Sequence, residues 1–187
     1  MASREKVVEL IDGNVNKIEG MIDQKVELWK EYVLFSDLWW MGVGLSIIPW
    51  VIWFFVRKKD STDRLLYVGF FIMTLALILD VLGDQMGFWH YRYHVIPVLP
   101  TYFPWDITLM PLTIMIIIQV FPNINPWLKA LFFAAMTSYL AEPFFHWLKV
   151  YEPDNWRYSY SFPIQVALYM SAHYLSKRTK FAEIKET

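Results

Sequence analysis

Residues 38–56 read LWWMGVGLSIIPWVIWFFV, an unbroken run without a formal charge. An α-helix rises about 1.5 Å per residue, so a run of this length covers the roughly 30 Å of hydrocarbon in a bilayer. The run is bounded by Asp37 on one side and by Arg57-Lys58-Lys59 on the other. It therefore predicts a membrane-spanning helix, and Pro49 predicts a kink within it.

Four more apolar segments follow this run along the chain. They cover residues 65 to about 89, 105–121, 126 to about 148, and 158–176. The last segment ends in Lys177-Arg178-Thr179-Lys180, a basic boundary like the one after the first. Residues 38–176 therefore predict an all-α, polytopic membrane bundle of about five transmembrane helices.

The composition supports this class and excludes several others. Hydrophobic residues make up 56% and aromatic residues 19% of the 187 residues. There is no cysteine, which excludes disulfides, thiolate metal sites and a cysteine nucleophile. A net charge of −1 provides no basic field for nucleic acid. The charged start, MASREK, has no apolar core of a cleavable signal peptide, so the first membrane helix is expected to direct insertion.

Residues 1–37 form a separate N-terminal arm, in which residues 3–33 predict one amphipathic helix. Val8, Ile11 and Val15 begin an apolar stripe with spacings of three and four residues, close to a heptad. Lys25 interrupts the stripe. One interpretation is an arm that docks a partner helix or a second copy of the chain. The alternative is a helix that lies on the membrane surface or on its own bundle.

Basic residues near the membrane predict the orientation. The linker 57–64 and the start of the 177–187 tail are rich in lysine and arginine, and five spans place both on one side. The positive-inside rule then puts the C-terminus in the cytoplasm and the arm outside, in a multi-pass protein of the cell membrane. The proline-rich segment 95–104 cannot form a helix, and we expect a lid or re-entrant loop packed over the outer helix ends.

Acids and a histidine gather at one depth in this arrangement. Asp80 and Asp84 lie four residues apart and face the same way on the second helix. Glu142 and His146 repeat the spacing on the fourth helix, and Asp106 opens the third. All five lie in the outer third of the predicted membrane. Ionisable groups in membrane helices are costly to bury and usually face the bundle interior in pairs, so we expect one buried acidic pocket.

Four interpretations of this pocket remain open. The first is a divalent-cation site in which Asp80, Asp84, Asp106, Glu142 and His146 are the ligands of Mg²⁺, Mn²⁺ or Zn²⁺. The second is an acid–base site for a lipid-like ligand, with Glu142 or Asp80 as catalytic proton donor and His146 orienting it. The third is a proton or ion pathway. In the fourth, the same groups form only hydrogen bonds that fix helix register.

These interpretations predict different protein classes. A binding or catalytic pocket would be lined by aromatic residues such as Trp89, Phe145 and Tyr160, and its ligand would be a cation or a lipid-like, isoprenoid-type molecule. An ion- or proton-coupled transporter would need a polar route to the inner face, for which Gln119, Gln165 and a few other residues are sparse candidates. A non-enzymatic assembly or signalling protein would act through its arm.

Three stretches of the chain carry a family resemblance. They are residues 79–84 (LDVLGD), 141–147 (AEPFFHW) and 158–163 (YSYSFP). Together they resemble an uncharacterised family of small multi-pass membrane proteins of endospore-forming bacteria, over roughly residues 38–176. The resemblance implies a bacterial plasma or spore membrane and implies no activity. In mechanism alone, the buried acids and aromatics are similar to those of membrane-embedded terpene and lycopene cyclases, which protonate alkenes.

Overall fold

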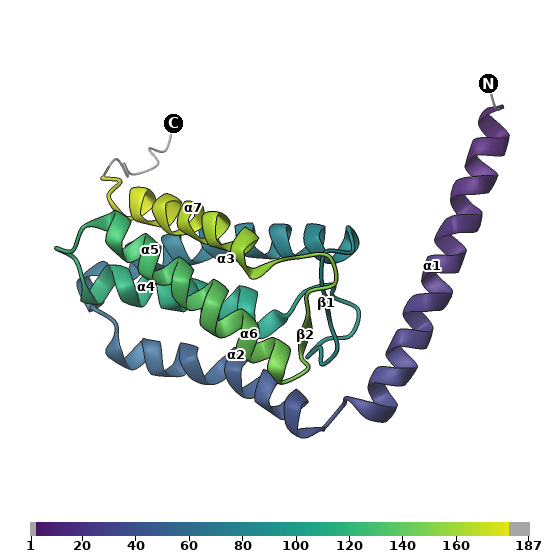
Figure 1. The fold of residues 1–187 in the computed structure, drawn as a ribbon, viewed down its shortest axis with the longest axis horizontal. Helices are drawn as coiled ribbons and strands as arrows, with labels where there is room; N and C mark the ends of the chain where they lie inside the picture. Colours follow the sequence, from purple (N-terminus) through teal and green to yellow (C-terminus); the bar gives the residue numbers. More distant parts are fainter. Residues whose placement is uncertain (1–2, 180–187) are drawn as a thin grey trace, which may run out of the picture.

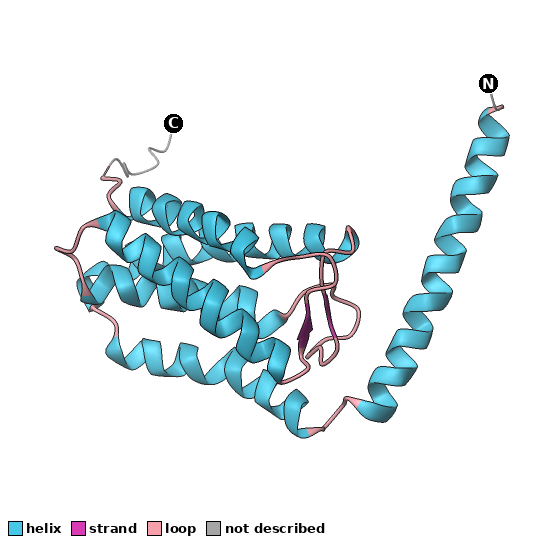
Figure 2. Ribbon diagram, in the orientation of Figure 1, coloured by secondary structure: helices cyan, strands magenta, loops and turns pink. Residues whose placement is uncertain are grey.

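The computed structural model describes residues 3–179, and these form helices with one short pair of strands (Figures 1 and 2). The α-helices are α1 (Arg4–Tyr32), α2 (Asp37–Val56), α3 (Thr62–Gln85), α4 (Met110–Val120), α5 (Pro126–Met136), α6 (Glu142–Trp147) and α7 (Tyr158–Ser176). The other elements are the 3-10 turn η1 (Lys59–Ser61), the π-turns η2 (Trp105–Leu109) and η3 (Thr137–Ala141), and the strands β1 (His90–Tyr91) and β2 (Tyr151–Glu152).

The all-α prediction is confirmed. Each of the five apolar segments is helical, and the last one, residues 158–176, coincides with α7. Among the described residues, two helices, Asp37–Val56 and Lys59–Gln85, are long and apolar enough to cross a membrane. Trp105–Val120 is a shorter apolar helix. Residues 180–187 of the expected tail lie outside the described residues.

Successive helical passes of the bundle run in opposite directions (Figure 1). The passes are α2, α3, η2 with α4, α5 with η3 and α6, and finally α7. The two strands pair antiparallel at one end of the bundle, with Tyr91 opposite Tyr151. We call this the strand end. The α2–α3 and α4–α5 links and the end of α7 lie at the opposite end, which we call the C-terminal end.

Both π-turns are explained by prolines. Each turn ends two residues before a proline, Pro111 after η2 and Pro143 after η3. Proline lacks an N–H, and its ring clashes with the carbonyl four residues earlier, so the preceding turn widens. For Pro111 that carbonyl belongs to Ile107, and it accepts instead from Trp50 Nε1 at 3.0 Å. The widened turns carry Asp106 within η2 and place Glu142 directly after η3.

The middle of the bundle is a closely packed apolar cluster, which we call the central core. It joins α3, α4, α5 and α7 through fully buried residues that include Ile72, Ile114, Phe133 and Tyr169. The outer faces of the same helices are also apolar: Phe70 of α3 is 61% exposed, and Phe132 of α5 is 60% exposed. Apolar residues therefore point both inward and outward, as in a bundle that lies in an apolar medium.

Helix α1 stands apart from the bundle (Figure 1). None of its residues is buried, and its apolar stripe is exposed at Val8, Ile11, Val15 and Ile18. Contact with the rest of the chain lies near its C-terminal end, where Trp29 Nε1 donates to the carbonyl oxygen of His94 at 2.7 Å. One interpretation of the sequence expected the arm to lie along its own bundle. The structure shows that it does not.

Candidate functional site

A pocket of about 210 Å³ lies at the strand end of the bundle. Its walls come from α3, η2, α6 and α7, and its roof comes from the strands and the loops beside them. Most of the lining is apolar or aromatic, including Trp89, Tyr102, Trp105, Phe145 and Trp156. Three acids, Asp80, Asp106 and Glu142, also line it. The pocket therefore combines a hydrophobic cavity with carboxyl groups, as ligand sites commonly do.

Asp80 is the most completely hydrogen-bonded of the three acids, and it is 6% exposed. Its Oδ1 accepts from Trp89 Nε1 at 2.8 Å and from the hydroxyl of Tyr91 at 2.7 Å. Its Oδ2 accepts from the backbone N–H of Tyr102 at 3.0 Å. Three donors converge on this carboxyl, so it acts as an acceptor that holds the roof onto α3.

Asp106 is the hydrogen-bonding neighbour of Asp80 and is 1% exposed. Because Asp80 already accepts from three donors, the bond between the two carboxyls requires Asp106 to be the donor. Two charged carboxylates this close would repel each other, so the hydrogen bond between them needs the proton of Asp106. The Oδ2 atom of Asp106 has no hydrogen-bond partner. This atom belongs to a side chain that lines the pocket.

Glu142 is the third acid of the pocket and lies at the start of α6. Its carboxyl interacts with the hydroxyl of Ser161, which itself accepts from Trp156 Nε1 at 2.9 Å. The Oε2 atom of Glu142 is buried and has no partner. A buried carboxyl oxygen without a partner is unusual, and here it lies in a cavity that could hold a ligand.

Gly83 allows the roof to close. A Cβ atom at this position would lie 1.9 Å from the indole ring of Trp89, which shows how closely the ring covers the backbone of α3. The same ring contacts Trp156, with centroids 5.0 Å apart. Glycine is therefore required one turn after Asp80, so that Trp89 can reach back to it.

The pocket reaches the outer surface along α3. Leu79 and Leu82 of α3 and Met86 just after it line the pocket, and each is more than a third exposed. Ile164 of α7 lines the neighbouring wall. The opening is therefore apolar and lies on the side of the bundle, between α3 and α7.

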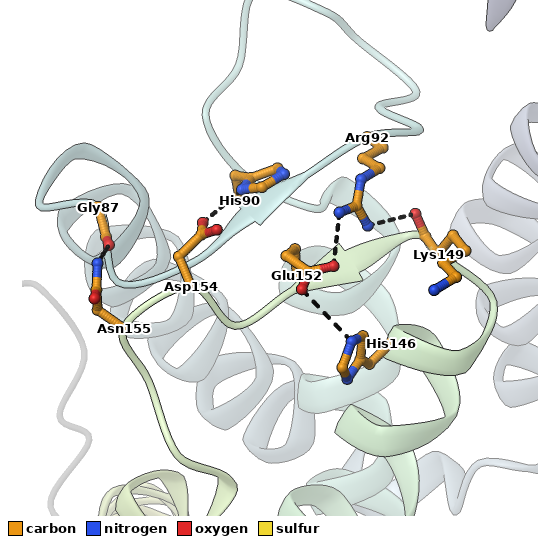
Figure 3. Close-up of polar contacts among 8 residues, drawn as sticks. All are labelled: Gly87, His90, Arg92, His146, Lys149, Glu152, Asp154 and Asn155. Carbon is orange, nitrogen blue, oxygen red and sulfur yellow. Dashed lines mark hydrogen bonds and ion pairs between the residues drawn. The ribbon is translucent and has the colours of Figure 1, made fainter.

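Polar residues tie the roof together on its outer side. Figure 3 shows Arg92, Glu152 and His146 pointing toward one another, with Arg92 and Glu152 2.6 Å apart and His146 and Glu152 3.6 Å apart. The hydrogen bond from Arg92 lowers the pKa of Glu152 below its usual value. His90 pairs with Asp154 at 2.6 Å. These contacts hold β1 against β2 and α6.

The roof tyrosines face the pocket and remain protonated. Burial, followed by the charge of Asp80, raises the pKa of Tyr91 well above its usual value. Burial also raises the pKa of Tyr102 and, with the charge of Glu142 adding to it, the pKa of Tyr151. Protonated hydroxyls can donate hydrogen bonds, and that of Tyr91 does so to Asp80, whereas that of Tyr102 is buried without a partner.

The five predicted metal ligands divide into two groups. Asp80, Asp106 and Glu142 line the pocket. Asp84 lies at the end of α3, where it accepts from Gln85 Nε2 at 3.2 Å, and His146 bonds the hydroxyl of Tyr158 through Nδ1. No group of three or more His, Asp or Glu side chains within residues 3–179 is arranged to hold a metal ion. The predicted five-ligand cation site is therefore not assembled.

The predicted pocket aromatics and the orienting histidine also divide. Trp89 and Phe145 line the pocket, whereas Tyr160 is 47% exposed and lies outside it. His146 bonds the hydroxyl of Tyr158 and pairs with Glu152. The residue that hydrogen-bonds Glu142 is Ser161 and not the predicted histidine. The sequence did not identify Tyr91, Tyr102 and Tyr151 as pocket residues. The pairing of β1 with β2 belongs to the same roof, and no local sequence pattern reveals it.

Known proteins add nothing to this geometry. Neither protein-family models, nor curated proteins, nor solved structures gave a match to the chain.

Proposed function

We propose that this chain is a five-span membrane protein whose strand-end pocket binds a lipid-like ligand. The single observation that carries the proposal is an apolar, aromatic pocket that opens sideways and contains a carboxyl oxygen of Glu142 without a partner. The strand end and the arm face outward, and the C-terminal end faces the cytoplasm. A bacterial cell membrane, as the sequence resemblance implies, is the proposed location.

Apolar outer faces support the membrane placement. On α2, Phe54, Phe55 and Ile52 are each more than half exposed, and Leu128 and Phe132 are equally exposed on α5. Soluble monomers rarely expose continuous apolar patches larger than a few hundred Å². With about 1.5 Å per residue, α3 is about 36 Å long and the pass from 126 to 147 about 33 Å, enough for the hydrocarbon.

The side opening supports a ligand that comes from the bilayer. In the proposed placement, Leu79, Leu82 and Met86 face lipid tails, so a molecule dissolved in the bilayer enters without crossing water. The aromatic walls bury apolar surface, which contributes about 25 cal/mol per Å². The few polar groups then orient one end of the ligand.

Glu142 supports a chemical role for the pocket. A protonated carboxyl in an apolar cavity is a suitable general acid, and its Oε2 atom has no competing partner. Aromatic faces such as those of Trp105 and Trp156 stabilise nearby positive charge. Proton donation from Glu142 to a lipid-like, isoprenoid-type ligand is therefore the chemistry that the site supports best, with Ser161 orienting the acid.

The transporter alternative receives less support. A transport route would have to continue from the pocket toward the C-terminal end. The central core fills that space with side chains such as Ile72, Ile114 and Phe133, all fully buried. The proposed pocket is therefore a closed end and not a passage.

The experiment is lipid mass spectrometry on the full-length protein purified in mild detergent. The wild type should retain a lipid-like molecule. Ala76→Leu places extra atoms in the pocket, because Ala76 is 2% exposed and lines it, and should abolish retention. Ala167→Leu is the matched control, since Ala167 is exposed on α7, and should retain the molecule.

Glu142→Gln separates binding from catalysis. This variant should retain the ligand, because the amide keeps the shape of the carboxyl, and it should stop any chemical change that wild-type protein produces in the ligand over time. Equal ligand retention by wild type and Ala76→Leu would show that the ligand does not bind in the strand-end pocket.

A second role is proposed for the arm, in which α1 pairs with α1 of a second copy. Its stripe of Val8, Ile11, Val15, Ile18 and Ile22 follows heptad spacing and is uncovered in the monomer. Light scattering in detergent should find an oligomer that Ile11→Asp with Ile18→Asp converts to a monomer. An unchanged mass would contradict this role and leave the pocket untouched.

A further inference from the structure

A second pocket, of about 170 Å³, lies at the C-terminal end of the bundle. Its charged lining residues are Lys58, Arg64, Lys129 and Lys177, and His173 lies among them. No carboxylate is found among the described residues that line it. We call it the basic pocket. The α2–α3 link, α3, α5 and α7 each contribute to it, so it is formed only when the whole bundle folds.

Lys129 is the central observation, because it is 4% exposed and has no carboxylate partner within residues 3–179. Its Nζ donates to the carbonyl oxygen of Phe121 at 2.9 Å. An ammonium group has three N–H donors, so two remain for another acceptor. A buried cation without a counter-charge is costly, and an anion in the pocket would remove that cost.

The other polar groups are arranged around the same space. His173 Nδ1 is buried without a hydrogen-bond partner. Arg64 Nη1 donates to the carbonyl oxygens of Ser176 at 2.8 Å and Arg178 at 2.6 Å, which fixes the guanidinium at the mouth. The side-chain amide of Gln119 binds the end of α2 and the link that follows it. It donates to Val56 O at 3.1 Å and accepts from Lys58 N at 3.0 Å.

We propose that the basic pocket binds a phosphate group, supplied by the headgroup of an anionic phospholipid. Several lysines and an arginine around one cavity match a phosphate, which accepts several charge-assisted hydrogen bonds at once. The cavity volume is several times the roughly 30 Å³ that a water molecule occupies in the liquid. A phosphate group therefore fits in the basic pocket. Basic pockets between membrane helices on the cytoplasmic side suit anionic headgroups, and the positive end of this bundle faces that side in the proposed orientation.

The test uses the full-length protein in a neutral detergent. Native mass spectrometry would measure binding of phosphatidylglycerol and, as a neutral reference, phosphatidylcholine. Isothermal titration would measure binding of inorganic phosphate. The variants are Lys129→Gln in the pocket, Lys177→Gln at its exposed rim, and Lys59→Gln as control. Lys59 is exposed and next to Lys58 in the chain, and it does not line the pocket.

The expected result is one tightly held phosphatidylglycerol, weakened about tenfold by Lys129→Gln and by Lys177→Gln and unchanged by Lys59→Gln. Lys177→Gln carries the test even if Lys129→Gln fails to fold, because Lys177 is exposed. Phosphate binding with the same residue dependence, and no lipid preference, would support the phosphate site and assign it to a soluble source.

Two outcomes would overturn the proposal. One is equal weakening by Lys59→Gln, which would indicate diffuse surface charge and not a site. The other is the absence of binding of either phosphate source. Neither outcome affects the strand-end pocket, because the central core separates the two pockets.

Discussion

The indole of Trp89 donates to Asp80 Oδ1 at 2.8 Å, and its ring lies directly on the backbone of α3 at Gly83. The chain leaves α3 at Gln85 and turns back through Gly87, whose φ of +70° suits glycine. The turn thus brings a residue nine positions later over the helix that it has just left.

Gly83→Ala should destabilise the protein by about 1–3 kcal/mol, because the added methyl group meets the ring of Trp89 and forces it away from Asp80. Thermal unfolding in detergent measures the effect. Gly13→Ala is the matched control: nothing lies within 4 Å of that position, and alanine should stabilise α1 by up to about 1 kcal/mol. In a Trp89→Ala background the cost of Gly83→Ala should disappear, and its persistence would contradict the assigned clash.

Asp80→Asn and Asp106→Asn should have opposite effects. An amide at Asp80 replaces one acceptor oxygen with an NH2 donor that faces the existing donors, which should cost about 1–3 kcal/mol. An amide at Asp106 can still donate to Asp80, so this variant should be neutral or stabilising. Chemical denaturation of both variants measures the difference. If Asp106→Asn proves the more harmful change, Asp106 is not the donor in the pair.

The contribution of His94 to stability should rise with pH between about 4 and 6.5, because this side chain is 2% exposed in the roof loop. Burial, followed by the charge of Lys25, lowers the pKa of His94 from 6.5 to about 4. The unfolded chain therefore binds a proton in this range that the folded chain does not, and stability falls as the pH falls below about 6.5. The loss should reach at most about 3 kcal/mol near pH 4.

His94→Gln should flatten that slope, as measured by unfolding at several pH values. Glu152 and the pocket carboxyls are the same in both proteins, so the contribution of His94 is the difference between the wild-type and His94→Gln stabilities at each pH. An equally steep slope in His94→Gln between pH 5 and 6.5 would assign the dependence to another group.

Lys149→Gly should stabilise the protein by between about 0.5 and 1 kcal/mol. Lys149 follows α6 with a φ of 62°, a left-handed conformation that costs a residue with a side chain more than glycine. The backbone hydrogen bonds from Lys149 N to His146 O and from Val150 N to Phe145 O should remain. Lys149→Ala keeps the side-chain penalty and should show no gain in melting temperature.

The helices could be read from the sequence because charges and prolines mark their ends. Pro126 begins α5, and Ser176 ends α7 just before Lys177-Arg178. Some of the pocket acids could also be predicted, because residues four apart lie on one face of a helix. The fourth residue lies about 6 Å farther along the axis, however. That step takes Asp84 and His146 beyond the roof, where Trp89 and the strands close the pocket.

The roof could not be read from the sequence because it depends on long-range contacts. Two residues of β1 pair with two of β2, about 60 positions away, and a pair so short leaves no alternating pattern. The prolines of segment 95–104 excluded a helix, yet they did not reveal that Tyr102 would reach Asp80. Tyr91, Tyr102 and Tyr151, which no local pattern marked as pocket residues, therefore line the pocket.

The bond between Trp29 and the carbonyl oxygen of His94 joins the arm to this roof. From His94 the path continues through its ring to the carbonyl oxygen of Thr101, and the next residue, Tyr102, donates to Asp80. One chain of hydrogen bonds thus links α1 to the buried carboxyl of Asp80 in the pocket wall. A displacement of α1 would therefore reach the pocket through the same segment that holds its roof to α3.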